Sequence, residues 1–195
     1  MVPVKARSAG KQRLAEALPA ETRTILIRTM LEHVVSVLQE TPGIEQVLVT
    51  SSDREPLPAA VRLLADAGAG LNGALEAAMA ELIARGATRA LIVFADLPLL
   101  TREDVAALLA AADTADITLA PDHTGTGTNA LNLALPTSLR FQFGPGSRTR
   151  HFAVAARVGL TAVAVERFGL AFDLDEPADL ETLRSRAHPR YAFLA

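Results

Sequence analysis

Short aliphatic runs alternate with stretches of helical spacing along most of this chain, and that alternation restricts the fold more than any other feature. Ala90–Ala95 and Asp116–Ala120 are two of the aliphatic runs. Within Glu21–Glu40, by contrast, apolar residues such as Leu31 and Val34 recur at the spacing that places them on one face of a helix. This order is typical of α/β proteins, so we predict a Rossmann-like fold with a mixed, mostly parallel sheet and helices on both faces.

The pattern predicts the bounds of individual elements. Strands are expected at Val2–Val4, Gln46–Thr50, Val61–Ala65, Ala90–Ala95, Asp116–Ala120, Asn129–Leu135 and Thr161–Val165. Helices are expected at Glu21–Glu40, Gly73–Arg85, Arg102–Ala112, Ser147–Val158 and Pro177–Arg186. No repeat, linker or composition break interrupts the chain, so we expect one domain over residues 1–195.

Composition narrows the classes of protein. The net charge of −3 gives no reason to expect binding to nucleic acid or to an anionic membrane surface. The absence of cysteine excludes disulfides, thiol catalysis and thiolate metal sites, and it fits a cytoplasmic protein. No apolar run reaches the length of a membrane span. The oligomeric state is left open, a homodimer included.

Three aspartates are candidates for a metal site. Asp96 ends an aliphatic run, where a buried carboxylate needs a partner such as Mg²⁺, although a turn aspartate before proline is the alternative. Asp173 and Asp175 alternate around Leu174, so both would point to one side of an extended segment. Asp175 or Glu176 could equally cap a helix that begins after them.

The N-terminal segment is basic. Lys5, Arg7, Lys11 and Arg13 all precede the first acidic residue, Glu16. They follow the first expected strand, where ligands bind in open α/β sheets, and could hold a triphosphate. A solvated basic N-terminus is the alternative, and the segment does not match the phosphate-binding loop of P-loop enzymes.

Gly68, Gly70 and Gly73 form a G-x-G-x-x-G pattern between an expected strand and an expected helix. The pattern suggests a dinucleotide site, with Asp96 near the spacing expected for the acidic residue. The alternative is a glycine-rich turn that precedes a helix.

Two further loops have the composition of anion sites. Gly125–Asn129 supplies hydroxyls and backbone amides, and Phe143–Ser147 leads into a helix whose first turn carries Arg148, Arg150 and His151. Ordinary turns with a helix cap are the alternative. Together with the basic segment, these loops point towards two phosphorylated substrates.

The motifs together resemble the 2-phospho-L-lactate guanylyltransferase family, which also includes phosphoenolpyruvate and 3-phospho-D-glycerate guanylyltransferases of coenzyme F-420 biosynthesis. The matching segments, in order, are Val2 to Lys5, Lys11 to Ala15, Gly70 to Asn72, Ala95 to Leu100, Ala120 to Asp122, Gly125 to Leu131, Phe143 to Ser147 and Phe172 to Asp175. The resemblance implies a GT-A-like nucleotidyltransferase fold and transfer of GMP from GTP to a phosphorylated three-carbon acid.

The resemblance also implies roles for individual residues. Asp96, Asp173 and Asp175 would hold Mg²⁺, while Thr128, Gly144 and Ser147 would hold the acid, with Arg148 beside them. Lys5, Lys11 and Arg13 would stabilise the triphosphate, and Gly70 and Asn72 would face the nucleotide together with Asp96. Which acid is used stays open among phosphoenolpyruvate, 2-phospho-L-lactate and 3-phospho-D-glycerate.

Other functions remain as alternatives. They are another nucleotidyltransferase of the same fold, acting in molybdenum-cofactor or sugar-phosphate chemistry, a dinucleotide-binding oxidoreductase, and a nucleotide sensor without catalysis. The three carboxylates argue against the sensor.

Overall fold

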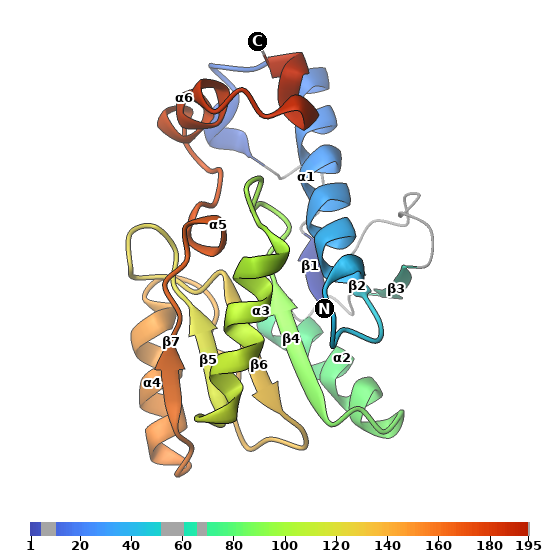
Figure 1. Cartoon of the computed structure of the whole chain (residues 1–195), viewed down its shortest axis with the longest axis vertical. Helices are drawn as coiled ribbons and strands as arrows, with labels where there is room; N and C mark the ends of the chain where they lie inside the picture. The colour runs from blue at the N-terminus through green and yellow to red at the C-terminus, as the bar shows by residue number, and fades with distance from the viewer. Residues whose placement is uncertain (5–10, 52–60, 66–69, 195) are drawn as a thin grey trace.

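A sheet of seven strands forms the centre of the computed structural model, which describes residues 1–4, 11–51, 61–65 and 70–194 (Figure 1). The strands are β1 (Val2–Val4), β2 (Leu48–Ser51), β3 (Arg62–Ala65), β4 (Arg89–Val93), β5 (Ile117–Ala120), β6 (Ala130–Ala134) and β7 (Ala162–Ala164). They form two hydrogen-bonded groups, β1-β2-β3 and β4-β6-β5-β7.

Two backbone hydrogen bonds connect these groups. The Met1 nitrogen donates to the Leu91 carbonyl, and the Val93 amide donates to the Met1 carbonyl over 3.0 Å. This is the pattern of a parallel pair, so β1 lies beside β4 and the strand order is β3-β2-β1-β4-β6-β5-β7. Only β6 is antiparallel to its neighbours among the described strands, which confirms a mixed, mostly parallel sheet.

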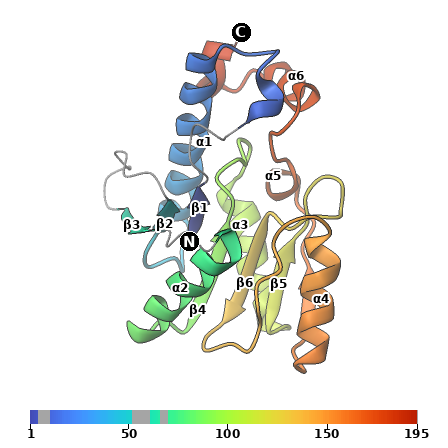
Figure 2. The same ribbon diagram turned by 180° about the vertical axis from the view of Figure 1, so that it is seen from behind.

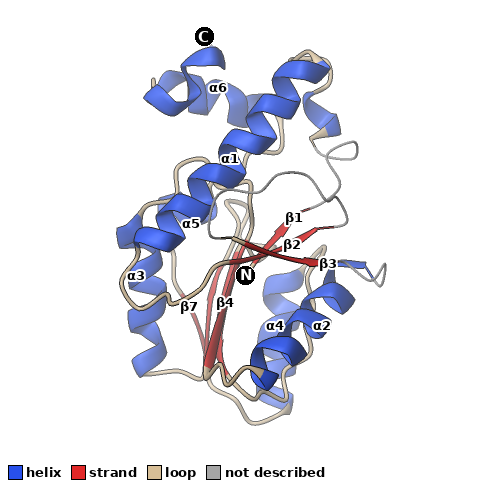
Figure 3. Ribbon diagram, turned by 90° about the vertical axis from the view of Figure 1, so that its right-hand side faces the viewer, coloured by secondary structure: helices blue, strands red, loops and turns tan. Residues whose placement is uncertain are grey.

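Helices cover both faces of the sheet (Figure 3). Three lie on one face: α1 (Ala20–Glu40), α3 (Arg102–Ala110) and the single turn α5 (Phe168–Ala171). Two lie on the other: α2 (Gly70–Ala84) and α4 (Ser147–Arg157). The sheet is therefore buried on both sides, as its aliphatic strands require.

Alternation along β4 divides the core into two layers. Ile92 packs into a cluster that includes Leu75 of α2, whereas its neighbour Val93 packs into a cluster that includes Val34 of α1 and Val105 of α3. All five side chains are fully or almost fully buried. Successive strand residues point to opposite faces, so one strand anchors helices from both layers.

A third cluster lies at the end of α1 that is remote from β2. There α6 (Pro177–Ser185) and the 3-10 helix η4 (Pro189–Leu194) pack against the first half of α1 and the short 3-10 helix η2 (Gln12–Leu14) (Figures 1 and 2). Leu14, Leu26, Leu180 and Leu194 are buried in it. This packing brings the C-terminal segment against η2, although the two are far apart in sequence.

The expected helices are present, with changed bounds. The helix expected from Gly73 begins at Gly70, so the last two glycines of the G-x-G-x-x-G pattern belong to α2. A capping box begins α3, with reciprocal hydrogen bonds between Thr101 and Asp104. α5, η4 and the 3-10 helix η3 (Ala111–Asp113) were not expected, because elements this short carry too little periodicity. No helix in the described part of the chain has the length and apolar character to cross a membrane.

Candidate active site

A cavity of about 620 Å³ opens above the carboxyl ends of the parallel strands. Its described lining comes from β1, β2, α1, α2 and η2, from the loops after β4 and between β5 and β6, from the turn that leads into α4, and from the segment between α5 and α6. Eight residues singled out from the sequence line it: Lys11, Arg13, Asp96, Thr128, Gly144, Ser147, Asp173 and Asp175. The fold therefore gathers most of the predicted site in one place.

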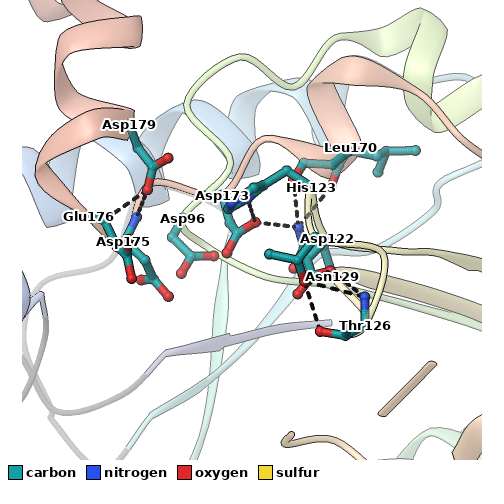
Figure 4. Close-up of polar contacts among 12 residues, drawn as sticks. Asp96, Asp122, His123, Thr126, Asn129, Leu170, Asp173, Asp175, Glu176 and Asp179 are labelled. Carbon is teal, nitrogen blue, oxygen red and sulfur yellow. Dashed lines mark hydrogen bonds and ion pairs between the residues drawn. The ribbon is translucent and has the colours of Figure 1, made fainter. Parts of the chain in front are cut away.

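Asp96 lies at the centre of one side of the cavity. It follows β4, and its backbone carbonyl accepts a 3.0 Å hydrogen bond from the amide of Leu174. Leu174 is fully buried, and its two neighbours, Asp173 and Asp175, line the cavity. Figure 4 shows the Asp96 carboxylate between those of Asp173 and Asp175. One backbone hydrogen bond thus brings together carboxylates that are almost eighty positions apart.

The Lys11 ammonium bridges two of these carboxylates. It donates to Asp96 Oδ2 and to Asp175 Oδ1, each over 2.7 Å. Its side chain is only 8% exposed. Burial alone would lower the pKa of Lys11, but attraction to Asp96 and Asp175 outweighs burial and raises that pKa. The Lys11 ammonium is therefore positively charged and fixed between the two carboxylates. We call Asp96, Asp173, Asp175 and Lys11 the carboxylate side of the cavity.

Asp173 has different partners. Its Oδ1 accepts a 3.1 Å hydrogen bond from Asn129 Nδ2 and lies 3.2 Å from His123 Nδ1. Burial, followed by repulsion from Asp96, raises the pKa of Asp173. Burial lowers the pKa of His123, but the hydrogen bond and the charge of Asp173 outweigh it, so the net shift is upward. The Asp173 carboxylate is crowded by negative charge.

The alternative role of Asp175 as a helix cap does not hold. Glu176 is the N-cap residue of α6, and its amide donates to the Asp179 carboxylate over 2.7 Å. The Asp175 amide uses the same carboxylate, and the Asp175 side chain accepts a hydrogen bond from Lys11. Arg13, a mostly exposed residue of η2, pairs with Glu176 over 3.1 Å.

The carboxylate side has features that fit a bound divalent cation. Asp96 Oδ1 is buried and has no hydrogen-bond partner in the described structure, which is costly for a carboxylate oxygen unless a cation binds it. The described lining holds four carboxylates, those of Asp96, Asp122, Asp173 and Asp175, against two cationic side chains, Lys11 and Arg13. However, no group of three or more acidic or histidine side chains in the described chain is already arranged to hold a metal.

A second part of the cavity lining is built from neutral groups. Thr128 Oγ1 accepts a 3.2 Å hydrogen bond from Ser147 Oγ, and it lies 3.2 Å from Nδ1 of His151. All three side chains are at most 2% exposed. Burial, with a smaller contribution from Arg150, lowers the pKa of His151 to about 4, so this imidazole is neutral at pH 7. We call Thr128 and Ser147, with His151 behind them, the hydroxyl side.

Side chains of α2 and α4 hold the backbone of Gln142 and Phe143, just before the Gly144–Gly146 turn. The Gln142 amide donates to His151 Nε2 over 3.0 Å, and the Gln142 carbonyl accepts from Arg150 over 2.9 Å. The Phe143 amide and carbonyl bond the side-chain amide of Asn72 over 2.9 and 3.1 Å. Four consecutive backbone groups are thus satisfied by α2 and α4, which fixes the start of the Gly144–Gly146 turn.

Glycine is required on the Thr128 loop. A side chain at Gly127 would place its Cβ 2.4 Å from Asp122 Oδ2, a separation that atoms do not reach. The same aspartate accepts the Thr126 amide over 2.9 Å, so the loop is wrapped tightly around Asp122 (Figure 4). This wrapping brings Thr128 to the cavity.

The structure places some predicted site residues elsewhere. Gly70, Asn72 and Arg148 are not among the cavity-lining residues. Arg148 donates to the Gly125 carbonyl and to Glu166, both over 3.4 Å. Lys5 lies outside the described residues, as do Arg7 and Gly68.

Comparison with known proteins identifies the family. The sequence profile described as "Guanylyl transferase CofC like" matches residues 1–191. This chain belongs to that family. A phosphoenolpyruvate guanylyltransferase of Sphaerobacter thermophilus is 41% identical over 191 residues, which cover 96% of this chain and 92% of the relative. A phosphoenolpyruvate guanylyltransferase of Rubrobacter xylanophilus is 41% identical over 197 residues, with 98% and 95% covered.

Solved structures confirm the fold. One is a protein of Desulfovibrio desulfuricans, itself only provisionally assigned as a nucleotide-diphospho-sugar transferase. Its TM-score to this chain is 0.77 at 17% sequence identity, and the match covers 99% of this chain and 91% of that chain. CMP:2-keto-3-deoxy-manno-octonic acid synthetase, solved with CTP, has a TM-score of 0.60 at 13% identity, with 95% and 96% covered. The guanylyl transferase family member described here is thus a nucleotidyltransferase by sequence and by fold, which sets the oxidoreductase alternative aside.

Two residues that support the site, His151 and Asn129, make contacts that were not predicted from the sequence. The sequence placed His151 only in the first turn of an expected helix, and the structure buries it behind Thr128. Its spacing of four from Ser147 places both on one face of α4 and could have suggested contact. Asn129, which orients Asp173, carries no such signal, because its partner lies 44 positions away.

Proposed function

We propose that this guanylyltransferase transfers GMP from GTP to phosphoenolpyruvate, releasing pyrophosphate, as a step of coenzyme F-420 biosynthesis. The choice of phosphoenolpyruvate over 2-phospho-L-lactate or 3-phospho-D-glycerate is supported by the names of the two relatives. All three acids offer a phosphate and a carboxylate, and they differ at the carbons between these groups.

One observation carries the proposal: two chemically different groups of residues line one cavity. The carboxylate side suits a cation and the triphosphate that a cation neutralises. The hydroxyl side, with the turn at Gly144, suits oxygens of a small phosphorylated acid. Such a cavity can place two phosphorylated molecules next to each other.

The proposed reaction needs no general base. A phosphate oxygen of the acceptor attacks the α-phosphorus of GTP, a new P–O bond forms, and the bond to the bridging oxygen of pyrophosphate breaks. The acceptor phosphate is already an anion near neutral pH, so no proton has to be removed. The protein then contributes by positioning both substrates and by stabilising charge.

Named residues would carry these tasks. Thr128 and Ser147 would orient the acceptor, while Lys11 and Arg13, with Lys5 outside the described residues, would stabilise the triphosphate and the departing pyrophosphate. Asp96, Asp173 and Asp175 would hold Mg²⁺, which supplies Lewis-acid stabilisation of the phosphate oxygens when bound. Lys11 would then exchange its carboxylate partners for phosphate oxygens.

An acceptor screen tests the proposal. The protein is incubated with GTP, Mg²⁺ and each acid separately, and pyrophosphate release and the mass of the product are measured. We expect equimolar pyrophosphate and a guanylylated acid, with the highest kcat/KM for phosphoenolpyruvate. Faster turnover of another acid would replace the acceptor but keep the reaction, whereas no pyrophosphate with any of the three would contradict the function.

A further inference from the structure

We propose that His151 is a positioning residue for the acceptor: by donating a hydrogen bond to Thr128, it directs the hydroxyl proton of Thr128 into the cavity. The inference rests on the proposed function, because the ligand that would receive this proton is an oxygen of the phosphorylated acid. His151 itself touches no part of the cavity, so its effect is exerted through Thr128.

The hydrogen bonds of His151 define its tautomer. The Gln142 amide can only donate, and it lies 3.0 Å from Nε2, so Nε2 carries no proton. A neutral imidazole with a free Nε2 has its proton on Nδ1. Nδ1 therefore donates to Thr128 Oγ1, 3.2 Å away, and the direction of that hydrogen bond is settled by a backbone group on the far side of the ring.

This direction determines what Thr128 can do. A hydroxyl accepts two hydrogen bonds and donates one. Thr128 Oγ1 accepts from His151 and also from Ser147 Oγ, over 3.2 Å in both cases, so its acceptor positions are filled. No described residue accepts the remaining proton, the hydroxyl proton of Thr128, and Thr128 lines the cavity. An anionic oxygen in the cavity is the partner that this proton fits.

The surroundings keep His151 in that state. The residue is 1% exposed, and the ring of Phe143 lies edge-on to it at 4.8 Å between centroids. Arg150, the next residue in the chain, holds the Gln142 carbonyl, so the backbone donor cannot turn away from the ring. Burial and the nearby guanidinium both disfavour a charged imidazole. His151 is thus fixed in position, in charge and in tautomer.

Two substitutions separate the two hydrogen bonds. His151→Gln places an acceptor near the position of Nε2 and can keep the Gln142 contact, but it has no donor near Thr128. His151→Asn places a donor near the position of Nδ1 and can keep the Thr128 contact, but it leaves the Gln142 amide without a partner. We expect the Gln variant to raise the KM for phosphoenolpyruvate by roughly three- to tenfold, the worth of one hydrogen bond.

The GTP KM and kcat of the Gln variant should stay within about twofold of wild type on the same reasoning. The Asn variant should show the smaller rise in acceptor KM of the two, although it loses more thermal stability. A purely structural role would make acceptor KM follow stability instead. The proposal is therefore overturned if the Asn variant, as the less stable protein, also has the higher acceptor KM.

A second measurement does not depend on turnover. Nitrogen-15 NMR of the wild-type protein distinguishes the two neutral tautomers of His151, and the Nδ1–H form is expected. Inorganic phosphate should bind the wild type roughly three- to tenfold more tightly than the Gln variant. The Nε2–H form, or equal phosphate affinity, would overturn the inference. A wild type that fails to turn over any acid would contradict the proposed function, while the tautomer and the phosphate affinity would still decide the role of His151.

Discussion

The two sides of the cavity are prepared in different ways. On the hydroxyl side, neutral groups bond one another: Ser147 and His151 saturate the acceptor positions of Thr128, and side chains hold the adjacent backbone. On the carboxylate side, Asp96 keeps a buried oxygen without a partner, and Lys11 supplies the charge that separates two carboxylates. The hydroxyl side lacks only an acceptor for the proton of Thr128, whereas the carboxylate side combines a buried, unpaired Asp96 oxygen with carboxylates that depend on the positive charge of Lys11.

This difference follows from the chemistry each side is proposed to perform. Neutral hydrogen bonds can be fixed during folding, because their partners cost little to bury together. Clustered carboxylates repel one another and need a cation, which binding of a metal and a nucleotide would bring. We therefore expect perturbations of the carboxylate side to act mainly on turnover, and those of the hydroxyl side on acceptor binding.

Apart from removal of Asp96 itself, Lys11→Met gives the largest expected effect. It removes the ammonium between Asp96 and Asp175 while keeping a similar side-chain volume, so the triphosphate would lose a stabilising charge. We expect kcat/KM for GTP to fall about a hundredfold, as for other groups that stabilise transition-state charge. Pyrophosphate release measures it.

The matched control for Lys11 is Lys11→Arg, which keeps the charge and should lose less activity than Lys11→Met. Without Mg²⁺, the Met variant should also unfold at a lower temperature, because two carboxylates would share a site with no counter-charge. Addition of Mg²⁺ should restore much of that loss. Equal activity of the Met and Arg variants would show that the charge at Lys11 is not used.

Acid should affect the two sides with opposite signs. The folded-state pKa of His151 is lowered to about 4, chiefly by burial, and so is that of His33, a buried residue of α1 away from the cavity. Between pH 6.5 and about 4 the unfolded chain therefore binds more protons at these residues, and the free energy of unfolding falls as pH falls. The loss at pH 5 is about 2 kcal/mol for each histidine. The raised pKa of Asp173 acts in the opposite direction, because protonation relieves its repulsion from Asp96.

Urea unfolding at pH 7 and pH 5 measures this acid response. His33→Gln can keep the hydrogen bond to the Leu100 carbonyl but cannot titrate, so it should remove about half of the loss. A wild-type stability that rises between pH 7 and pH 5 would mean that the buried histidines are not neutral in the folded protein.

Asn72→Ala tests which side Asn72 serves. The sequence assigned Asn72 to the nucleotide, whereas the structure shows both of its amide atoms on the Phe143 backbone. Loss of both hydrogen bonds should lower the free energy of unfolding by about 2 kcal/mol and raise the acceptor KM severalfold. Asn72→Asp keeps an acceptor for the Phe143 amide. Its unfolding free energy and its acceptor KM should therefore lie between those of the wild type and the Ala variant. An effect on the GTP KM alone would instead favour the nucleotide role.

Arg148→Ala should have the smallest effect. Arg148 contacts the Gly125 carbonyl and the exposed Glu166, so it can influence the acceptor only through the loop that carries Thr128. We expect the acceptor KM to rise less than threefold, which is typical of an exposed pair. The mostly exposed Arg140 provides a matched control substitution. A tenfold rise would place Arg148 in direct contact with the acid.

The sequence was informative where a residue follows a regular element. Asp96 could be placed at the end of a buried strand because β4 is a clear aliphatic run, and Ser147 could be placed at the start of α4 because a glycine-rich turn precedes it. The mixed sheet was also predictable in outline, although the antiparallel direction of β6 depends on pairing between distant strands.

Contacts between distant segments could not be predicted in this way. Nothing in the residues around Lys11 indicates that its ammonium bridges Asp96 and Asp175, since that contact requires the C-terminal segment to fold back over η2. The burial of His151 is similar: its helical position is readable, but its tautomer depends on the Gln142 backbone on another segment. Such details are properties of packing.

Asp96→Ala, compared with the wild type in one pyrophosphate-release assay, tests the central claim most directly. The assay contains GTP and phosphoenolpyruvate, with Mg²⁺ or with an excess of EDTA. We predict that the wild type turns over only with Mg²⁺ and that the variant loses at least about a thousandfold in kcat/KM. The variant should still bind the acceptor, because the hydroxyl side is untouched. Near-normal turnover by the variant, or by the wild type in EDTA, would contradict the assignment of the carboxylate side as the place where a cation activates GTP.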